Sequence, residues 1–493
     1  MKNTIIAIDQ STSATKVMLF NEQCQLDERV NVPHQQFYPQ PGWVEHDAEE
    51  IYQNVLKGLG QLLEGKCQKE TSFSLAITNQ RETVVVWDKR TGKPVYHAVV
   101  WQCMRGADFC KELNEKGYGK MVQERSGLLI DPYFSASGVK WILDNVPNAR
   151  EDAEAGHLLM GTIDSWLVFK LTEGRRHVTD LTNASRTLLL NIKELQWDEE
   201  LLRLFTIPRN MMPEILPCDS VFGETTFEGL LENPIQIAGV LGDSHGALAG
   251  QMCFESGLGK ATYGTGSSVM VNIGEQFVSA PSGLVTSIGF AALGKVFYSF
   301  EGNIHCTGAT LKWLQEQVQL IASPDEVEDA AIEAGDNDGV YLVPAFAGLG
   351  APWWKSDVKA AILGMTLSTK RSHILRAALE SIAYQVNDLV QAMVGQAGID
   401  LKEIRVDGGP TKNKTLMQFQ ADCLRVPVDK SDVEEASALG AVVMNCMARK
   451  VWKNFEEVAR LRRSKGRILP LNNKPQMDKW ISGWHNAVDQ LVK

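Results

Sequence analysis

The chain has 493 residues, of which 44% are apolar, and a formal net charge of −11. This length supports roughly two or three hydrophobic cores, and the composition excludes a disordered chain. The acidic balance disfavours non-specific binding to nucleic acid. Nine cysteines without a C-x-x-C pair predict reduced thiols, and we expect neither a signal peptide nor a membrane span. These features together indicate a cytoplasmic protein.

The first predicted element is a hairpin at the N-terminus. Residues 5–8 and 17–20 are short apolar runs that predict two strands. Asp9 ends the first run, and the hydroxyls of Ser11 and Thr12 follow it, so that the turn could surround an anion. A carboxylate beside an anion site is what a magnesium-bound phosphate requires. An ordinary polar hairpin turn remains the structural alternative.

A charged pair lies between the next two predicted strands. The strands cover residues 73–77 and 84–87, and Arg81 and Glu82 lie between them. In a regular strand these neighbours would point to opposite faces, so both reach one ligand only if the backbone turns there. Their five donors and two acceptor oxygens suit a polyhydroxy compound. A solvated salt bridge in a loop is the alternative.

Two aromatic residues could complete a polyol site. Trp101 lies in AVVWQCMR and Tyr133 in IDPYFS. An aromatic ring can cover the carbon side of a polyol while a phenol hydroxyl bonds an oxygen. Most residues of these types are simply part of a core, which is the alternative.

A single acidic residue follows a buried strand near the middle of the chain. The strand is predicted at residues 237–240, and Asp243 lies in a glycine-flanked turn before a helix expected from Ala247. Such strand-to-helix corners carry catalytic groups in α/β folds. A helix N-cap explains an aspartate at this position equally well.

The second half repeats the opening hairpin. Residues 260–271 form two strand-like runs around a turn at residues 264–266 that is mostly glycine. The repeat predicts two similar domains that each present one phosphate-holding turn to a shared cleft. A strand at residues 403–407, followed by Gly408, Gly409 and a helix from Asn413, suits the approach of a nucleotide.

Helices and strands alternate along the rest of the chain, which predicts α/β layering. The C-terminal part is expected to be polar and helical, with a solvated basic run at residues 460–467. The further helices are expected at residues 47–64, 136–145, 165–171, 372–394 and 435–447, and further strands at residues 158–160 and 339–346.

Nine motifs occur in order over nearly the whole chain. They are DQSTSATK (9–16), PGWVEHD (41–47), ITNQRET (77–83), VVWQC (99–103), IDPYF (130–134), VTDLTNASRT (178–187), YGTG (263–266), GLGAPWW (348–354) and VDGGPTKN (406–413). In this combination the chain resembles the FGGY carbohydrate kinases, most closely the glycerol kinases among them. The resemblance implies an α/β, actin-like and ribonuclease-H-like ATPase fold with an interdomain cleft. Residues 1–246 would form the substrate and Mg/phosphate side, and residues 247–493 the nucleotide side.

The same resemblance implies the cofactors ATP and Mg²⁺ and transfer of the γ-phosphate to a hydroxyl group. Asp9 would organise the Mg²⁺, and Asp243 would be the catalytic base. The residues that would contact the polyol are Arg81, Glu82, Trp101 and Tyr133. The residues near the phosphates and the nucleotide would be Thr12, Ser13, Lys16, Thr265, Gly266, Gly308, Lys312, Gly409 and Asn413.

Two serines depart from the family pattern in the substrate pocket. Ser244 and Ser268 stand where glycerol kinases usually carry a glutamine and an aromatic residue. Losing an aromatic wall and gaining two hydroxyls near His245 predicts a larger, wetter pocket, suited to a tetritol, a pentitol or a pentulose. In the alternative, Met270 or another neighbour fills the gap and the substrate is glycerol, converted to glycerol 3-phosphate.

Two lysines also depart from the pattern. Lys16 occupies a position that is usually arginine, so it keeps the charge and loses the forked geometry. Lys312 stands where glycerol kinases often carry glutamine, which weakens the match around Gly308.

The expected partners are small molecules and further copies of the chain. The family resemblance implies a polyol or sugar substrate and a homodimer or homotetramer. A more remote alternative is a non-catalytic, actin-like ATP-binding protein, because the same fold serves both roles. Such a protein would not need Arg81 and Glu82 beside Trp101.

Overall fold

The computed structural model describes residues 2–64, 71–353, 355, 357–433, 435–471 and 473–493. Unit 1 comprises Met1–Phe254, Ser287–Tyr298 and Glu435–Arg462, and unit 2 comprises Glu255–Thr286, Ser299–Glu434 and Arg463–Lys493. These compact units do not follow a single cut of the chain, so the expected domains 1–246 and 247–493 remain a prediction. Trp354, which ends the GLGAPWW motif, lies outside the described residues.

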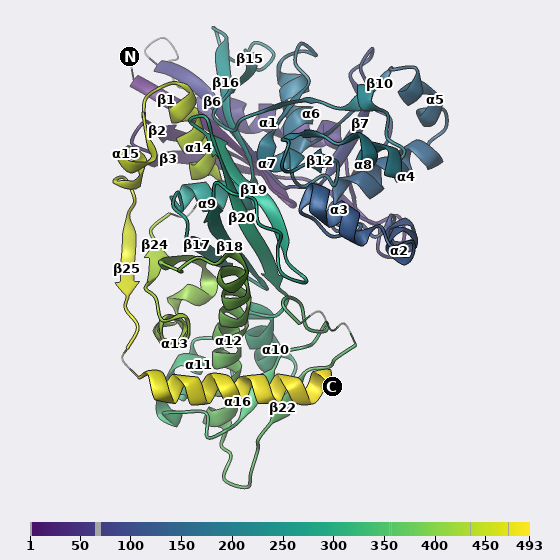
Figure 1. Ribbon diagram of the computed structural model, residues 1–493. Coiled ribbons are helices and arrows are strands. Elements are labelled where there is room, and N and C mark those ends of the chain that lie inside the picture. The colour runs from purple at the N-terminus through teal and green to yellow at the C-terminus, as the bar shows by residue number, and fades with distance from the viewer. Residues whose placement is uncertain (1, 65–70, 354, 356, 434, 472) are drawn as a thin grey trace. The chain divides into compact units, whose positions relative to one another are not determined.

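Unit 1 is built on a six-stranded mixed sheet with the order β15-β16-β6-β1-β2-β3 (Figure 1). At its centre β1 pairs antiparallel with β2 and parallel with β6, and β6 pairs parallel with β16. The predicted first hairpin and the predicted strands at residues 73–77 and 237–240 are therefore confirmed. The bounds are β1 Lys2–Gln10, β2 Ala14–Asn21, β3 Leu26–Pro33, β6 Thr71–Asn79, β15 Val221–Thr225 and β16 Ile235–Gly242.

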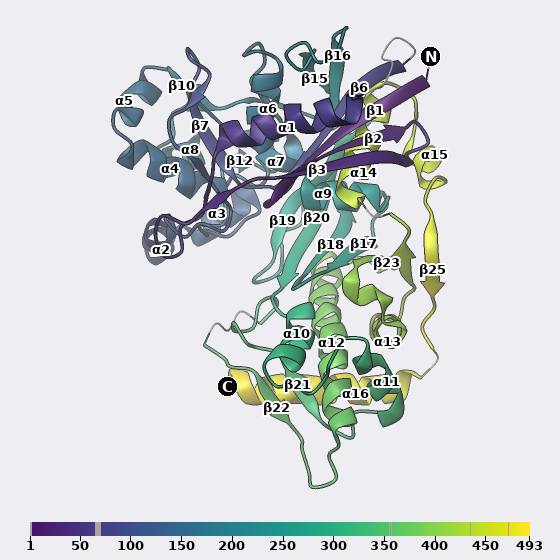
Figure 2. The ribbon, with the colours of Figure 1, turned by 180° about the vertical axis from the view of Figure 1, so that it is seen from behind.

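Helices cover both faces of this sheet because its side chains alternate between the faces. Ile6, Ile8 and Leu75 pack in one core with α1 (Ala48–Leu63), and Figure 2 shows α1 running across the strands. On the opposite face, the Ser74 hydroxyl donates to Asn445 Oδ1 at 2.9 Å, a residue of α14 (Ala436–Ala448). The predicted helices at residues 47–64 and 435–447 are thus confirmed.

A second six-stranded sheet, built of shorter strands, and several helices complete unit 1. The second sheet contains β4 Gln36–Phe37, β5 Glu45–His46, β7 Val84–Asp88, β8 Lys93–Pro94, β9 Ala98–Val99 and β10 Leu158–Thr162. Two short strand pairs are β11 Val178–Asp180 with β14 Glu214–Leu216, and β12 Leu190–Asn191 with β13 Gln196–Trp197. The other helices are α2 Ala107–Glu115, α3 Gly119–Ser126, α4 Ser135–Asn145, α5 Ala149–Glu154, α6 Ile163–Leu171, α7 Leu181–Ala184, α8 Glu199–Leu204, η2 Arg209–Met211, α9 Asp243–Gly250 and α15 Phe455–Ala459.

Unit 2 repeats the strand order of unit 1. In the sheet order β19-β20-β18-β17-β23-β24-β25, the strands β20-β18-β17-β23-β24-β25 correspond to β3-β2-β1-β6-β16-β15, although Ser287–Tyr298, which includes most of β19, is counted in unit 1. As in unit 1, a central strand pairs antiparallel with its hairpin partner and parallel with the next strand. The bounds are β17 Leu258–Tyr263, β18 Ser267–Gly274, β19 Val285–Ala292, β20 Lys295–Ile304, β23 Glu403–Gly408, β24 Val428–Ser431 and β25 Ser464–Ile468. The duplication expected from the two hairpins therefore extends over six strands.

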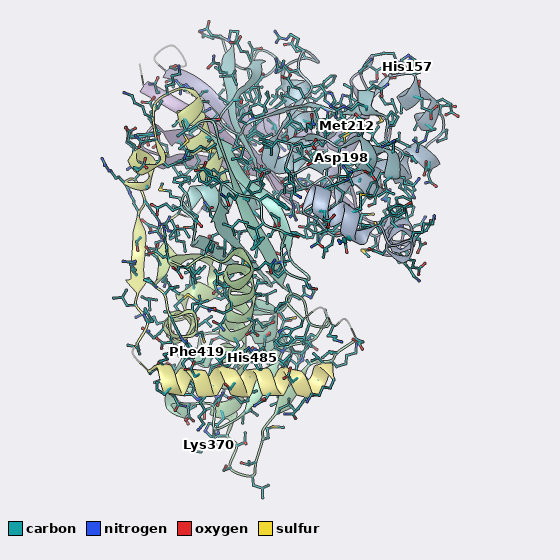
Figure 3. The ribbon with its side chains drawn as sticks, in the orientation of Figure 1. His157, Asp198, Met212, Lys370, Phe419 and His485 are labelled. Atoms are coloured by element: carbon teal, nitrogen blue, oxygen red, sulfur yellow. The ribbon has the colours of Figure 1, made fainter. Side chains whose placement is uncertain are left out.

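Helices of unit 2 pack around the long α12 (Arg371–Ala397). Asp388 on α12 accepts hydrogen bonds from Trp484 Nε1 at 2.7 Å and from His485 Nε2 at 2.8 Å, and both donors belong to α16 (Lys474–Val492). Figure 3 labels His485, which belongs to α16, and Phe419, which lies beside this helix. The other elements are α10 Gly308–Glu316, α11 Glu326–Ala334, β21 Tyr341–Val343, β22 Ala361–Leu363, η3 Gly409–Lys412 and α13 Lys414–Leu424.

The structure corrects the expected C-terminal part. Residues 454–493 are not helical throughout, because the edge strand β25 overlaps the end of the basic run. Lys465 pairs with Asp432 and Arg467 with Glu403, each at 3.0 Å. Charged side chains are common on edge strands because they discourage pairing with other chains. The expected solvent exposure of this run is confirmed for its strand residues, whereas its expected helical structure is wrong.

No helix in the described part of the chain is long and apolar enough to cross a membrane.

Candidate active site

Three of the predicted motifs meet at one edge of the unit 1 sheet. Asp9 lies at the end of β1, and the register pairs Gln10 with Asn79 at the end of β6. Asn79 in turn pairs with Gly242 at the end of β16, and Asp243 follows immediately. Because β1, β6 and β16 are parallel, their carboxyl ends lie side by side, as is usual for ligand sites of α/β sheets.

The backbone turns sharply after β6, as the predicted polyol pair requires. Glu82 has a φ of 63°, in the left-handed region, and Thr83 N–H donates to the Arg81 carbonyl at 2.7 Å. A left-handed backbone at a non-glycine residue costs about 1–3 kcal/mol and persists only where the surroundings hold it. Arg81 is 5% exposed and Glu82 is 2% exposed. The alternative of a solvated salt bridge is therefore wrong.

Asp243 joins this pair. Its Oδ1 lies 3.1 Å from Arg81 Nε and accepts from the N–H of Ser244 at 2.6 Å. Asp243 is the first residue of α9, and Gly242 is the N-cap. The helix therefore begins four residues before the expected Ala247, and the N-cap alternative for Asp243 is wrong. With its side chain 37% exposed, the carboxylate is accessible to a substrate.

Close packing against the Arg81 side chain explains the glycine that precedes Asp243. A Cβ at Gly242 would lie 2.5 Å from Arg81 Cγ. Such a contact is shorter than side chains tolerate, so a larger residue here would displace Arg81. The glycine lets the guanidinium pass close to the start of α9 and reach Asp243.

Asp9 is a buried carboxylate with a cation nearby. Burial raises the pKa of Asp9 to about 7, against the opposing effect of Lys16, and the carboxylates of Asp243 and Glu435 raise it further. Lys16 Nζ lies 3.8 Å from Asp9 Oδ2 but 2.7 Å from Glu435 Oε2. Glu435 also pairs with Arg29 at 3.0 Å. Lys16 is thus shared between two acids.

A hydrogen bond connects the first hairpin turn to one of the predicted aromatic residues. Thr12 Oγ1 accepts a hydrogen bond from Trp101 Nε1 at 3.0 Å, and the ring of Trp101 lies 5.4 Å from that of Tyr133. Both rings are half-buried, and together with Glu82 they line one cavity. The cavity is small, at about 10 Å³, and it is the partial exposure of both rings that shows they are not simply part of a core. Ser13 is exposed at the tip of the turn.

In unit 2 the predicted nucleotide residues gather at the corresponding strand ends. Tyr263 at the end of β17 pairs with Gly408 at the end of β23. The N–H of Gly308, which opens α10, donates to the Gly264 carbonyl, and that of Ala309 donates to the Thr265 carbonyl, each at 3.0 Å. The turn at residues 264–266, the start of α10 and the Gly408–Gly409 turn therefore form one cluster.

Steric constraints explain two glycines of this cluster. A Cβ at Gly266 would lie 2.3 Å from the Ile304 carbonyl oxygen, and one at Gly308 would lie 2.7 Å from the Gly264 carbonyl oxygen. A Cβ at Gly409 would meet nothing within 4 Å. The first two glycines are thus required by backbone packing, whereas Gly409 leaves open space.

The remaining predicted residues of unit 2 have other contacts. Asn413 caps α13, because its side chain accepts from the N–H of Leu416 at 2.8 Å. The side chain of Lys312 is 67% exposed and lies 3.7 Å from Glu316. Ser268 Oγ accepts from the buried ammonium of Lys260 at 3.1 Å. The roles assigned to these residues remain predictions.

Two charged residues of unit 1 were not predicted from the sequence. Glu435 binds Lys16, and Arg186 Nε donates to Glu82 Oε1 at 2.5 Å while buried to 2% exposure. Arg186 belongs to the VTDLTNASRT motif, which was noted without a role. Apart from Asp180, Arg186 is the one charged residue of this motif. That is the signal that could have identified it, because a buried charge needs a partner. For Glu435 the sequence offers only weak evidence, namely that an acidic residue precedes a helix of small residues.

Comparison with known proteins identifies the family. The model of the FGGY family of carbohydrate kinases, N-terminal domain, matches residues 4–250, and that of the C-terminal domain matches residues 259–449. Glycerol kinase 1 of Thermotoga maritima is 48% identical over 489 residues and glycerol kinase of Bacillus cytotoxicus 46% over 490, with 99% of each chain covered. The crystal structure of Plasmodium falciparum glycerol kinase with ADP superposes with a TM-score of 0.95 at 37% identity, covering 100% of this chain and 99% of the other. The chain belongs to the FGGY family of carbohydrate kinases and is an ATP-dependent phosphotransferase.

Proposed function

We propose that the protein phosphorylates glycerol, producing glycerol 3-phosphate and ADP. The observation that carries this proposal is the group formed by Arg81, Glu82 and Asp243 beside the Trp101–Tyr133 wall. Full-length identity of 46–48% to proteins named glycerol kinase supports the same substrate. This evidence favours the alternative over our first expectation of a longer polyol or a ketose.

The contacts of Ser268 weaken the argument for a wetter pocket. Its hydroxyl already accepts a hydrogen bond from Lys260 Nζ. One of the hydrogen-bonding positions that was expected to serve a longer substrate is therefore occupied within unit 2. Ser244 follows the catalytic carboxylate, and its N–H is bonded to Asp243.

The polyol-binding residues divide the task between polar and apolar contacts. Arg81 donates to a hydroxyl oxygen and Glu82 accepts from a hydroxyl hydrogen, which fixes the orientation of the chain. The rings of Trp101 and Tyr133 cover its carbon atoms. Because these groups are held by burial and by a turned backbone, little ordering is needed when glycerol binds.

Asp243 acts as the general base in this proposal. It accepts the proton of the attacking hydroxyl, whose oxygen forms a bond to the γ-phosphorus of ATP while the bond from that phosphorus to the β–γ bridging oxygen breaks. ADP is the leaving group. Phosphoryl transfer gains most from alignment and from charge stabilisation, with the proton leaving late. The pairing with Arg81 holds the carboxylate in place for this step.

Magnesium fits the acidic residues of unit 1. Mg²⁺ is usually held by one or two carboxylates together with substrate phosphates and water. Asp9, with Asp243 nearby, provides such carboxylates, and the described residues contain no cluster of three or more His, Cys, Asp or Glu side chains that could hold a metal ion alone. When bound, Mg²⁺ would neutralise charge on the phosphate oxygens. Lys16, together with Thr12 and Ser13 of the hairpin turn, would contact the phosphates.

The nucleotide side of the proposal rests on unit 2. The cluster of Thr265, Gly266, Gly308 and Gly409 provides a surface with little side chain, which suits close approach of a nucleotide. Asn413 and Lys312 would lie at its border. The proposal also includes a cytoplasmic location and a homodimer or homotetramer, on the strength of the family resemblance.

A substrate panel tests the proposal. ATP consumption with Mg²⁺ is measured for glycerol, dihydroxyacetone, erythritol, xylitol, ribitol and the D- and L-pentuloses, and kcat/KM values are compared. We expect glycerol to have the highest value. A longer polyol or ketose that exceeds glycerol a hundredfold, about 2.7 kcal/mol in transition-state binding, would refute the proposal. That result would restore the larger pocket expected from Ser244 and Ser268.

A further inference from the structure

The VTDLTNASRT motif forms a buried polar segment that the proposed reaction does not use. It contains the strand β11, the short helix α7 and the residues after it. The side chains of Asp180, Thr182 and Asn183 are fully buried, and that of Arg186 is nearly so. Burying so many polar groups is costly unless each finds partners of good geometry. Their hydrogen-bond partners include Gly242, which precedes Asp243, and Glu82 of the polyol-binding turn.

Asp180 anchors the segment. Its carboxylate accepts from the backbone N–H groups of Thr182 at 2.7 Å and Asn183 at 3.0 Å, and from the side chains of Thr182 at 2.6 Å, Asn183 at 2.8 Å and Cys218 at 3.3 Å. A carboxylate with this many donors is held firmly in one orientation. It therefore fixes the positions of both side chains that follow it in α7.

Thr182 connects this anchor to the start of α9. Its hydroxyl donates its single hydrogen to Asp180, which leaves a lone pair to accept from the Gly242 N–H at 2.9 Å. Gly242 is the N-cap of α9 and immediately precedes Asp243. The bond therefore holds the backbone from which the catalytic carboxylate projects.

Asn183 and Arg186 connect the same segment to the polyol turn. The amides of Asn183 and Asn79 exchange two hydrogen bonds of 3.0 Å, and Asn79 is the last residue before the turn that carries Arg81 and Glu82. Arg186 Nε donates to Glu82 Oε1 at 2.5 Å, and its Nη1 donates to Ser287 Oγ at 2.9 Å. The guanidinium carbon lies 5.7 Å from the centre of the Tyr133 ring.

We propose that residues 180–186 are a positioning segment. It holds the catalytic base Asp243 and the turn with Arg81 and Glu82 in the correct positions relative to each other. Thr182 acts on Asp243 through Gly242, and Arg186 acts on the polyol through Glu82. The inference rests on the proposed roles of Asp243 and Glu82. It assigns to this motif a role in turnover and substrate affinity beyond the stability that any buried network provides.

Thr182→Val tests the connection to the base. The variant removes the hydroxyl that links Asp180 to Gly242, and Thr182→Ser retains it. Thr172→Val is the matched control, because Thr172 is equally buried in unit 1 and its hydroxyl bonds to backbone groups of α6 and the loop after it. We expect Thr182→Val to lower kcat about tenfold or more, since small displacements of a reacting group cost up to about a hundredfold. The KM for glycerol should change less than about threefold, and the other two variants should keep normal kcat.

Non-additivity separates positioning from stability. If Thr182 acts through Asp243, Thr182→Val should lower kcat by less than about twofold when Asp243 is already asparagine. Likewise, Arg186→Lys should raise the KM for glycerol about tenfold in the wild type and little in Glu82→Gln. All rates are measured on folded protein at the same temperature, with the melting temperature recorded for each variant. Should Thr182→Val fail to fold, Thr182→Cys replaces it, because its thiol forms much weaker hydrogen bonds.

Two outcomes would overturn the inference and are distinguishable from failure of the proposed function. Lower melting temperatures with unchanged kcat and KM would show that the segment only stabilises the fold. Suppose instead that Thr182→Val lowers kcat as much in Asp243→Asn as in the wild type, and that Arg186→Lys raises the KM as much in Glu82→Gln as in the wild type. Thr182 would then not act through Asp243, nor Arg186 through Glu82. Normal turnover of Asp243→Asn by itself would instead refute the proposed base, and the Thr182 connection with it.

Discussion

Replacing Asp9 by asparagine is expected to stabilise the protein while it abolishes most of the activity. The native carboxylate is buried, at 7% exposure, and its pKa is raised to about 7 from an ordinary value of 3.8. Asparagine has a similar shape and no charge to desolvate. Ionisation of the buried Asp9 therefore destabilises the folded wild type, and the variant has no such penalty.

The size and sign of this effect follow from the pKa shift. The folded state holds the Asp9 proton up to about pH 7, whereas the unfolded chain releases it near pH 4, so the folded state binds more protons between these values. The wild type therefore loses stability as the pH rises through this window. At about 1.4 kcal/mol per pKa unit, the advantage of Asp9→Asn should grow by about 2–3 kcal/mol between pH 5 and pH 8.

Urea unfolding of both proteins at pH 5 and pH 8 measures this difference. Asp88→Asn is a useful control, because a hydrogen bond from Arg90 lowers the pKa of Asp88 to about 2. Both folded and unfolded states are ionised at Asp88 across the same window, so any loss of stability in that variant should be equal at the two pH values. A stability difference between Asp9→Asn and the wild type that does not change from pH 5 to pH 8 would refute the reasoning.

Three further predictions concern the two units. Asp243→Asn should lower kcat on the order of a hundredfold or more with little change in the KM for glycerol, as measured by ATP consumption; near-normal turnover would contradict its role as base. Arg81→Lys should raise the KM for glycerol about tenfold or more, because lysine keeps the charge but cannot contact Asp243 and a hydroxyl with a fixed fork; an unchanged KM in a glycerol titration would exclude this role. Gly266→Ala should lower the stability of unit 2 by about 1–3 kcal/mol, because its Cβ would meet the Ile304 carbonyl at 2.3 Å. Gly409→Ala, whose Cβ meets nothing, is the control for urea unfolding, and equal stability of the two variants would show that the turn relaxes around the new side chain.

Local patterns in the sequence predicted much of the fold. Short apolar or strand-like runs identified β1, β2, β17 and β18, and apolar side chains at helical spacing identified α1 and α12, because buried elements need a continuous apolar surface. The edge strand β25 was missed because its exposed residues show no alternation of apolar and polar side chains. The start of α9 was placed too late because Ser244, His245 and Gly246 lack an apolar helical pattern.

The site was predicted less completely, because its contacts join distant segments. The strand ends indicated Asp9, Arg81, Glu82 and Asp243, and the motif resemblance indicated the family. The Lys16–Glu435 pair joins the two ends of the chain, so no local pattern predicts it. The prediction of a longer substrate was based on Ser244 and Ser268 alone, because the sequence does not show which side chains contact them. Contacts of Ser268 with Lys260 and full-length identity to glycerol kinases now favour glycerol.

The destabilising features of unit 1 lie at the sheet edge where the proposed chemistry occurs. Glu82 has a left-handed backbone, Asp9 is a buried acid, and the ion pair of Glu82 with Arg186 is almost completely buried. Each of these features lowers the stability of the folded state. Strained or desolvated groups of this kind concentrate at functional sites. The polar segment around Asp180 supplies the hydrogen bonds that hold two of the three motifs in place. Substitutions that relieve one of these features should therefore exchange activity for stability, whereas substitutions in the supporting segment should lower both.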